Sequence, residues 1–186
     1  MAGGSATRGR PAPERSEASQ ALSDPEGRDV DADPVEVAKS ILLRQLTTSA
    51  KSRHQLAQAL ARKGVPAEAA DEALDRFVDL GYIDDEAFAR SWVESRQRSR
   101  GLAAPLLRRE LHEKGIAPET IDAVIADQVD DERERAAASA LVDKKLRSLR
   151  GVDADTATRR LVSMLARKGY RPGLAYAVAR EALTRQ

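Results

Sequence analysis

This chain of 186 residues is poor in histidine and cysteine, two side chains that often act as a catalytic base, nucleophile or metal ligand. His54 and His112 are the only histidines, and the absence of cysteine excludes thiol nucleophiles and zinc–thiolate sites. The paired carboxylates Asp84–Asp85 and Asp130–Asp131 could bind a metal, but adjacent residues on a helix point in different directions. No phosphate-binding motif of the form GxxxxGK[ST] or GxGxxG occurs. The sequence therefore predicts a binding protein and not an enzyme, with no metal and no cofactor.

Clustered cations are the groups most able to contact a partner. A first cationic cluster falls in the stretch RQRSRGLAAPLLRR, and a second begins at KKLRSLR and continues downstream. Two interpretations stay open: solvated helix ends, where cations complement the helix dipole, or a surface for DNA or for an acidic protein. The first cluster is Arg96, Arg98, Arg100, Arg108 and Arg109, and the second is Lys144, Lys145, Arg147, Arg159 and Arg160.

Carboxylates gather in a different part of the chain. Residues 68–86, the acidic segment, hold eight carboxylates against the single cation Arg76. Opposite charges are therefore segregated along the sequence, which suits a protein that meets two unlike surfaces.

Three similar segments must position these charges. They read LARKGVPAE, LHEKGIAPE and LARKGYRPG, and their glycines Gly64, Gly115 and Gly169 lie 51 and 54 residues apart. An apolar residue four positions before each leucine marks the buried face of a helix. The glycine suits the left-handed position that ends a helix, and the proline after it suits the first turn of the next helix. The chain is thus a threefold repeat.

Amphipathic runs on both sides of each glycine helix complete three-helix units, and no segment alternates with period two. We predict an all-α fold of three tandem three-helix repeats in an elongated, curved array. Unit one spans 34–83, unit two 84–129 and unit three 130–186. Residues 1–33, rich in Gly, Pro, Ser and acidic residues, are expected to form a disordered tail. No apolar run is long enough to span a membrane, so we expect a cytoplasmic protein.

The stretch GYIDDEAFARSWVESR gathers three aromatic residues in a chain that has six. We predict that Gly81 ends one helix, that Ile83 packs at the corner and that Asp84 caps the next helix. Phe88 and Trp92 stand four apart on one face, where they are expected to close the seam between units. The alternative is a stacking platform for nucleic acid bases.

Residues 80–116 resemble the hallmark segment of the RecX family, GYIDDxxFAxxWVxxR followed by a basic glycine-containing loop and LxxELxxKGI. The three tandem units extend the resemblance over about residues 35–186. We interpret the hallmark residues as mainly structural. They are Gly81, Tyr82, Ile83, Asp84, Asp85, Phe88, Trp92 and Gly115.

The resemblance implies a partner and a function. RecX proteins bind the RecA filament in its groove, inhibit its ATP hydrolysis, strand exchange and filament extension, and so regulate homologous recombination, DNA repair and the SOS response. On this reading the two cationic clusters contact RecA or single-stranded DNA, and the protein acts as a monomer. Two alternatives stay open: a helical-repeat protein that binds single-stranded DNA without RecA, and a helical scaffold for another partner.

Overall fold

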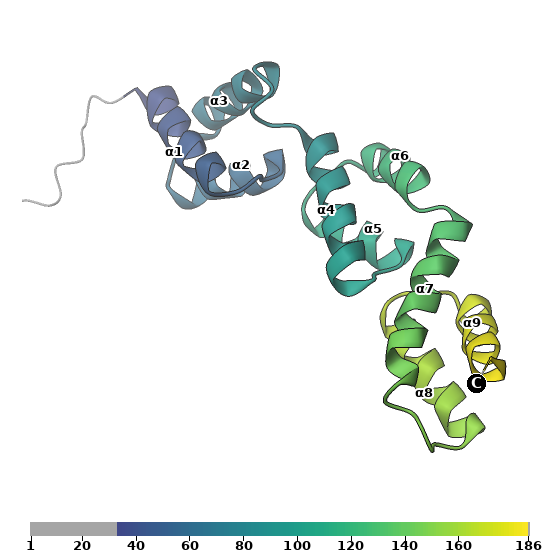
Figure 1. Cartoon of the computed structure of the whole chain (residues 1–186). Helices are drawn as coiled ribbons and strands as arrows, with labels where there is room; N and C mark the ends of the chain where they lie inside the picture. Colours follow the sequence, from purple (N-terminus) through teal and green to yellow (C-terminus); the bar gives the residue numbers. More distant parts are fainter. Residues whose placement is uncertain (1–32, 186) are drawn as a thin grey trace, which may run out of the picture. The chain divides into compact units, whose positions relative to one another are not determined.

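The structure, a computed structural model, describes residues 33–185. These residues form nine α-helices and no strand, which confirms the predicted all-α fold of three three-helix units (Figure 1). Most of the expected tail, 1–33, lies outside the described residues. Its last residue does not belong to a tail, because Asp33 is the N-cap of the first helix and its carboxylate accepts a hydrogen bond from the Val35 amide at 2.9 Å.

Unit one contains helices α1 (Pro34–Thr48), α2 (Arg53–Arg62) and α3 (Ala67–Asp79). Each helix buries one stripe of apolar residues, and the three stripes meet in a core of their own. Leu42 of α1 and Leu60 of α2 are fully buried in this core.

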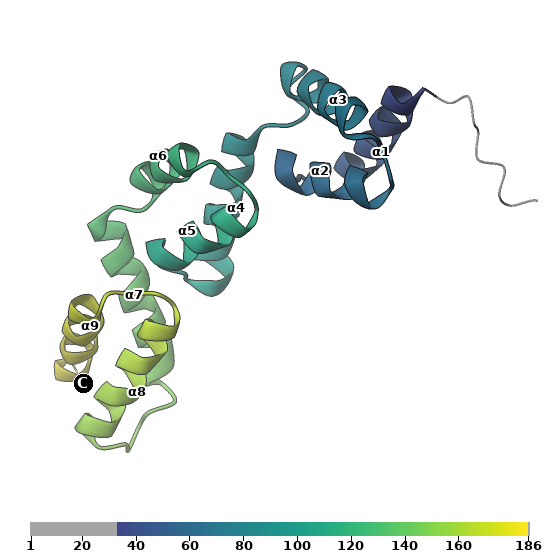
Figure 2. The ribbon, with the colours of Figure 1, turned by 180° about the vertical axis from the view of Figure 1, so that it is seen from behind.

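Units two and three repeat this arrangement. Unit two contains α4 (Asp85–Arg100), α5 (Ala104–Glu113) and α6 (Pro118–Gln128). Unit three contains α7 (Asp131–Leu146), α8 (Ala154–Arg167) and α9 (Pro172–Thr184). In both views of the ribbon α8 and α9 lie beside α7 (Figures 1 and 2). Each unit has a separate hydrophobic core, so the described part of the chain folds around three small cores instead of one.

The predicted helix ends are largely confirmed. The carboxylates of Asp84 and Asp130 accept hydrogen bonds from the backbone amides three residues on, at 2.8 and 2.7 Å. Asp153, for which no cap was predicted, caps α8 in the same way at 2.8 Å. The three repeat glycines have φ values between 73° and 88°, the left-handed conformation expected of them. Pro118 and Pro172 begin α6 and α9, but Pro66 does not enter α3 and is its N-cap.

Two valines of the predicted amphipathic runs do not belong to the core. Val37 of α1 and Val78 of α3 are 38% and 42% exposed, although their neighbours Ala38 and Phe77 are buried. A unit of three short helices buries only a narrow stripe of each helix, and both valines flank that stripe.

Units one and two meet at the N-terminus of α2. The Ser52 hydroxyl donates to the Lys114 carbonyl at 2.6 Å, and the Arg53 amide donates to the carboxylate of Asp85 at 2.8 Å. Gly115 lies against His54 so closely that an added Cβ would fall 2.3 Å from the His54 Cβ. A glycine turn of unit two therefore packs on a helix of unit one.

Units two and three meet in the same way at the N-terminus of α5. The Ala103 amide donates to the Lys168 carbonyl at 2.9 Å, and the Ala104 amide donates to the carboxylate of Glu134 at 3.3 Å. Gly169 packs against Leu106, as Gly115 packs against His54. In both junctions a lysine carbonyl and a carboxylate of one unit accept hydrogen bonds at the helix start of the unit before it, and the carboxylate accepts from an amide of that helix start.

The prediction that Phe88 and Trp92 close the seam between units is wrong. Their rings stack with centroids 5.8 Å apart, and they belong to the core of unit two. The contacts between units are made mainly by the glycine turns. One aromatic residue also takes part: buried Tyr170 of unit three donates its hydroxyl to the Gly101 carbonyl of unit two at 3.2 Å.

The first junction can be tested with two glycine substitutions. Gly64 and Gly115 share the same left-handed conformation, but a Cβ on Gly64 would meet nothing within 4 Å. We expect Gly64→Ala to lower the free energy of unfolding by about 1 kcal/mol through backbone strain alone. Gly115→Ala should lower it by about 2 kcal/mol more, because the methyl group collides with His54. Urea unfolding measures both variants, and equal losses would contradict this account of the seam.

The second junction predicts a pH effect. Burial, with a smaller contribution from the Glu134 carboxylate, raises the pKa of Tyr170 from 10.0 to about 12. The folded protein therefore holds the phenol proton to higher pH than the unfolded chain. Its stabilising contribution is complete below pH 10 and is lost as the pH rises toward 12. Urea midpoints should fall more steeply over this range for the wild type than for Tyr170→Phe, and parallel curves would refute the assignment.

Candidate functional site

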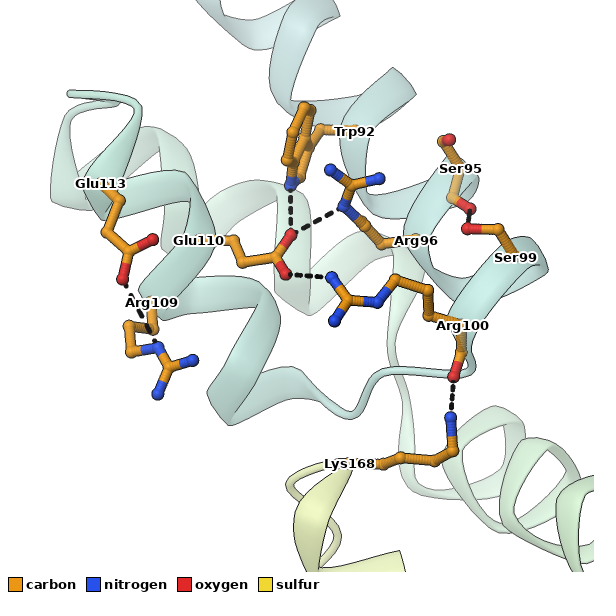
Figure 3. A network of polar contacts seen from close by, with 9 residues as sticks. All are labelled: Trp92, Ser95, Arg96, Ser99, Arg100, Arg109, Glu110, Glu113 and Lys168. Atoms are coloured by element: carbon orange, nitrogen blue, oxygen red, sulfur yellow. Dashed lines mark hydrogen bonds and ion pairs between the residues drawn. The ribbon is translucent and has the colours of Figure 1, made fainter.

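The carboxylate of Glu110 holds the middle of the first cationic cluster together (Figure 3). One oxygen accepts from the Trp92 indole nitrogen at 3.0 Å and from Arg96 Nε at 2.8 Å, and the other accepts from Arg100 Nη1 at 3.0 Å. Only 16% of the Glu110 side chain is exposed, which strengthens these charge-assisted bonds. Arg96 and Arg100 are therefore fixed in place between α4 and α5.

The indole ring of Trp92 is also in contact with cations. The Arg96 guanidinium carbon lies 3.9 Å from the ring centroid, and Lys114 Nζ lies 4.7 Å from it. With its N–H bonded to Glu110 and its ring packed on Phe88, the side chain is engaged within unit two. This geometry favours the structural interpretation of Trp92 over a platform for bases.

The remaining cations of the first cluster point outward but have carboxylate partners. Arg98 pairs with Glu94, Arg108 with Asp122, and Arg109 lies 3.6 Å from Glu113. Exposed pairs of this kind contribute little to stability and exchange partners readily. The structure thus divides the cluster into two fixed arginines and three exposed ones.

Three members of the second cationic cluster, together with Arg167, line an open hollow between the end of α7 and α8. Lys145, Arg159, Arg160 and Arg167 surround a volume of about 830 Å³ together with neutral residues. Arg159 donates to the Thr156 hydroxyl at 3.1 Å and Arg167 to the Ser163 hydroxyl at 2.7 Å, so neither hydrogen bond pairs the arginine with a carboxylate. The charge of Arg159 also helps to lower the pKa of the nearby Asp153, after the hydrogen bonds from Thr156. None of the described residues that line the hollow is acidic. This hollow, the unit-three hollow, is suited to a polyanion.

The other members of the second cluster, Lys144 and Arg147, are exposed outside the lining of the unit-three hollow. Cations nevertheless approach one another near the second junction. The ammonium of Lys168 donates to the Arg100 carbonyl across that junction (Figure 3). Burial lowers the pKa of Lys168, and the charges of Arg100 and Lys144 lower it further. An anion at this place would relieve the repulsion between them.

Two features escaped the sequence analysis. Glu110 holds Arg96 and Arg100 in place, and nothing in the sequence separates it from Glu113 in the same basic stretch, 96–114. Tyr82, interpreted as structural, is 59% exposed, whereas Ile83 beside it is 3% exposed. Tyr82 is therefore available to a partner.

The described residues contain no assembled catalytic or metal-binding group. His54 serves the first junction, and His112 lies exposed at the end of α5. No three His, Cys, Asp or Glu side chains within 33–185 are placed to hold a metal ion. No helix in the same range is both long enough and apolar enough to cross a membrane. Fold and surfaces together define a helical-repeat protein built to bind macromolecules.

Comparison with known proteins identifies the family. Sequence models of the first, second and third three-helix domains of RecX match residues 38–77, 84–125 and 131–178. The chain is 51% identical to the regulatory protein RecX of Streptomyces coelicolor over 151 residues, which are 81% of this chain and 80% of that one. It is 42% identical to that of Thermobifida fusca over 146 residues, 78% of each chain. The chain belongs to the RecX family of non-enzymatic regulatory proteins.

Solved structures show the same fold. The crystal structure of RecX from Lactobacillus salivarius superposes with a TM-score of 0.74 at 16% identity, covering 82% of this chain and 98% of that one. A second crystal structure of a regulatory protein RecX gives a TM-score of 0.69 at 23% identity, covering 80% and 72%. The three-unit architecture is thus shared at low sequence identity.

The Glu110 cluster can be tested by two glutamate substitutions one turn apart. Glu110→Ala removes three charge-assisted bonds and should lower the free energy of unfolding by about 2 kcal/mol. It should also shift the fluorescence of Trp92, the only tryptophan. Glu113→Ala loses one exposed contact at 3.6 Å and should change stability by less than about 0.5 kcal/mol. Indistinguishable urea curves and spectra would rule out the proposed role of Glu110.

Proposed function

We propose that the chain regulates RecA by binding the RecA filament on single-stranded DNA and lowering its ATP hydrolysis, strand exchange and extension. The observation that carries this proposal is the match of all three units to successive RecX domains, with 51% identity to a RecX protein over most of the chain. As a member of this family the chain is a RecA regulator. What we propose is how it acts, by binding the filament and inhibiting its reactions.

The described surfaces support an action on protein and nucleic acid together. The unit-three hollow offers four cations to phosphate groups, and the acidic segment of unit one offers carboxylates, which DNA repels. A filament groove has a protein wall and a nucleic acid wall, so a regulator with two oppositely charged surfaces can address both. We further propose that it acts in the cytoplasm, as a monomer and without a cofactor.

The first cationic cluster also supports this proposal, but only through its three exposed arginines. Arg98, Arg108 and Arg109 are exposed and their carboxylate partners lie at the surface, so a filament could replace those partners. Arg96 and Arg100 are fixed by Glu110 and would act by holding this surface in shape.

The direct test is RecA ATP hydrolysis on single-stranded DNA with the protein titrated from far below to above the RecA concentration. We expect inhibition at ratios below one protein per RecA, because a filament regulator need not coat the DNA. Arg159→Glu/Arg160→Glu should raise the inhibitory concentration about tenfold, since it reverses two charges in the unit-three hollow. The control Arg62→Glu/Lys63→Glu makes the same charge change at the exposed end of α2. Equal weakening by both variants would remove the hollow from the mechanism.

A second candidate function is single-stranded DNA binding without RecA, and the four cations of the unit-three hollow, which has no acidic lining residue, favour it. It predicts DNA affinity that falls steeply with salt in proportion to the phosphates contacted. RecA inhibition would then appear only at protein concentrations that saturate the DNA. Inhibition far below saturation would exclude this alternative.

A further inference from the structure

We infer that the α3–α4 corner, residues 78–85, docks a protein segment that presents an apolar side chain next to lysine or arginine. The inference rests on the proposed function, because the segment would belong to the protein wall that the regulator meets. It assigns the recognition of protein to unit one, apart from the cationic surfaces of units two and three.

The corner exposes large apolar side chains, although one face of the Tyr82 ring lies against Phe77, with ring centroids 5.5 Å apart. Val78, Leu80 and Tyr82 are 42%, 50% and 59% exposed, and they alternate within five residues. They are half of the exposed large hydrophobic side chains in the described part of the chain. Apolar side chains gathered in this way mark an interaction surface more often than scattered ones do.

The corresponding corner of unit two has no such exposure and is shorter, with two residues between its helices where the α3–α4 corner has five. There α6 leads into α7, and the residue before the capping Asp130 is Val129, which packs against the unit-two core. In unit one Ile83 has that role before Asp84 and is 3% exposed. The position next to it is Gln128 in unit two and Tyr82 in unit one. One corner is closed by a single apolar residue, and the other adds three that face outward.

Two hollows flank the corner and share Asp84. One, of about 370 Å³, is lined by Val78, Gly81, Ile83 and Asp85 together with Arg53. The other, of about 190 Å³, has Tyr82 and Phe88 in its wall. An incoming apolar side chain can therefore enter beside Val78 or beside Tyr82 while a neighbouring cation meets Asp84.

The charge around the corner selects the partner. The corner ends the acidic segment, in which eight carboxylates accompany one arginine. Arg53 on the rim is bound to Asp75 at 2.6 Å, so Lys51 is the other cation near the hollows. Asp79, between Val78 and Leu80, forms no ion pair within the described residues. Nucleic acid is repelled by such a surface and a cationic protein segment is attracted.

The experiment compares a double variant of the corner with a single control variant in the RecA hydrolysis assay. Leu80→Ser/Tyr82→Ser removes the apolar contacts, and Tyr176→Ser is the control, because Tyr176 is 51% exposed in unit three. We expect the first variant to need about tenfold more protein for half inhibition, as loss of a docking contact predicts. Tyr176→Ser should behave as the wild type. Both variants should bind single-stranded DNA without RecA as the wild type does.

Each outcome decides the inference. If the wild type inhibits RecA and Leu80→Ser/Tyr82→Ser inhibits equally well, the corner is not a docking surface and the proposed function stands. If the wild type fails to inhibit, the proposed function and this inference fall together. Should the double variant lose helicity, Asp79→Lys decides instead, because it changes an exposed charge and removes no packed group. Its inhibition should weaken, and unchanged inhibition would overturn the inference.

Discussion

The free amides at the start of a helix are the constraint that organises this chain. A helix leaves its first amides without backbone partners, and burying them against another unit is costly unless something accepts their hydrogen bonds. At α2 and α5 acceptors for these amides come from the next unit: the Asp85 carboxylate accepts from the Arg53 amide, and the Lys168 carbonyl and the Glu134 carboxylate accept from the amides of Ala103 and Ala104. At α2 the Lys114 carbonyl adds a hydrogen bond from the Ser52 hydroxyl. Both junctions follow one rule, so unit two holds unit one in the way that unit three holds unit two. The glycines at these turns are required because a side chain there would occupy the space of the neighbouring helix.

Much of this fold follows from short-range chemistry that a sequence displays. Aspartate before a helix, glycine after it and leucines four apart are local signals, and the structure places Asp84, Gly115 and Leu111 as those signals predict. The position of Trp92 was not predictable in the same way. A large aromatic side chain fits a seam or a core equally well, and its burial in unit two depends on Glu110, eighteen residues away.

The sequence predicted where in the chain the candidate site lies, but not which side chains contact one another there. Composition locates clustered arginines, but it does not reveal which of them a carboxylate from another helix will hold. Arg96 and Arg98 look alike in the sequence, yet one is held by Glu110 across two helices and the other pairs with Glu94 on its own helix. The exposure of Val78 on α3 could not be predicted for a related reason. Periodicity indicates which face of a helix is apolar, but the width of the buried stripe depends on the helices packed against it.

Three separate cores also determine how the described chain responds to force and to binding. Each core belongs to about fifty residues, a size at which an isolated unit is only marginally stable, so cooperative unfolding depends on the junctions. A partner that binds two adjacent units adds contacts to the few hydrogen bonds between them and makes that junction more rigid. A partner that binds a single unit leaves the junction with the next unit free to bend. Hydrogen exchange at the amides of Arg53 and Ala104 would therefore report the footprint of a bound polymer without any label.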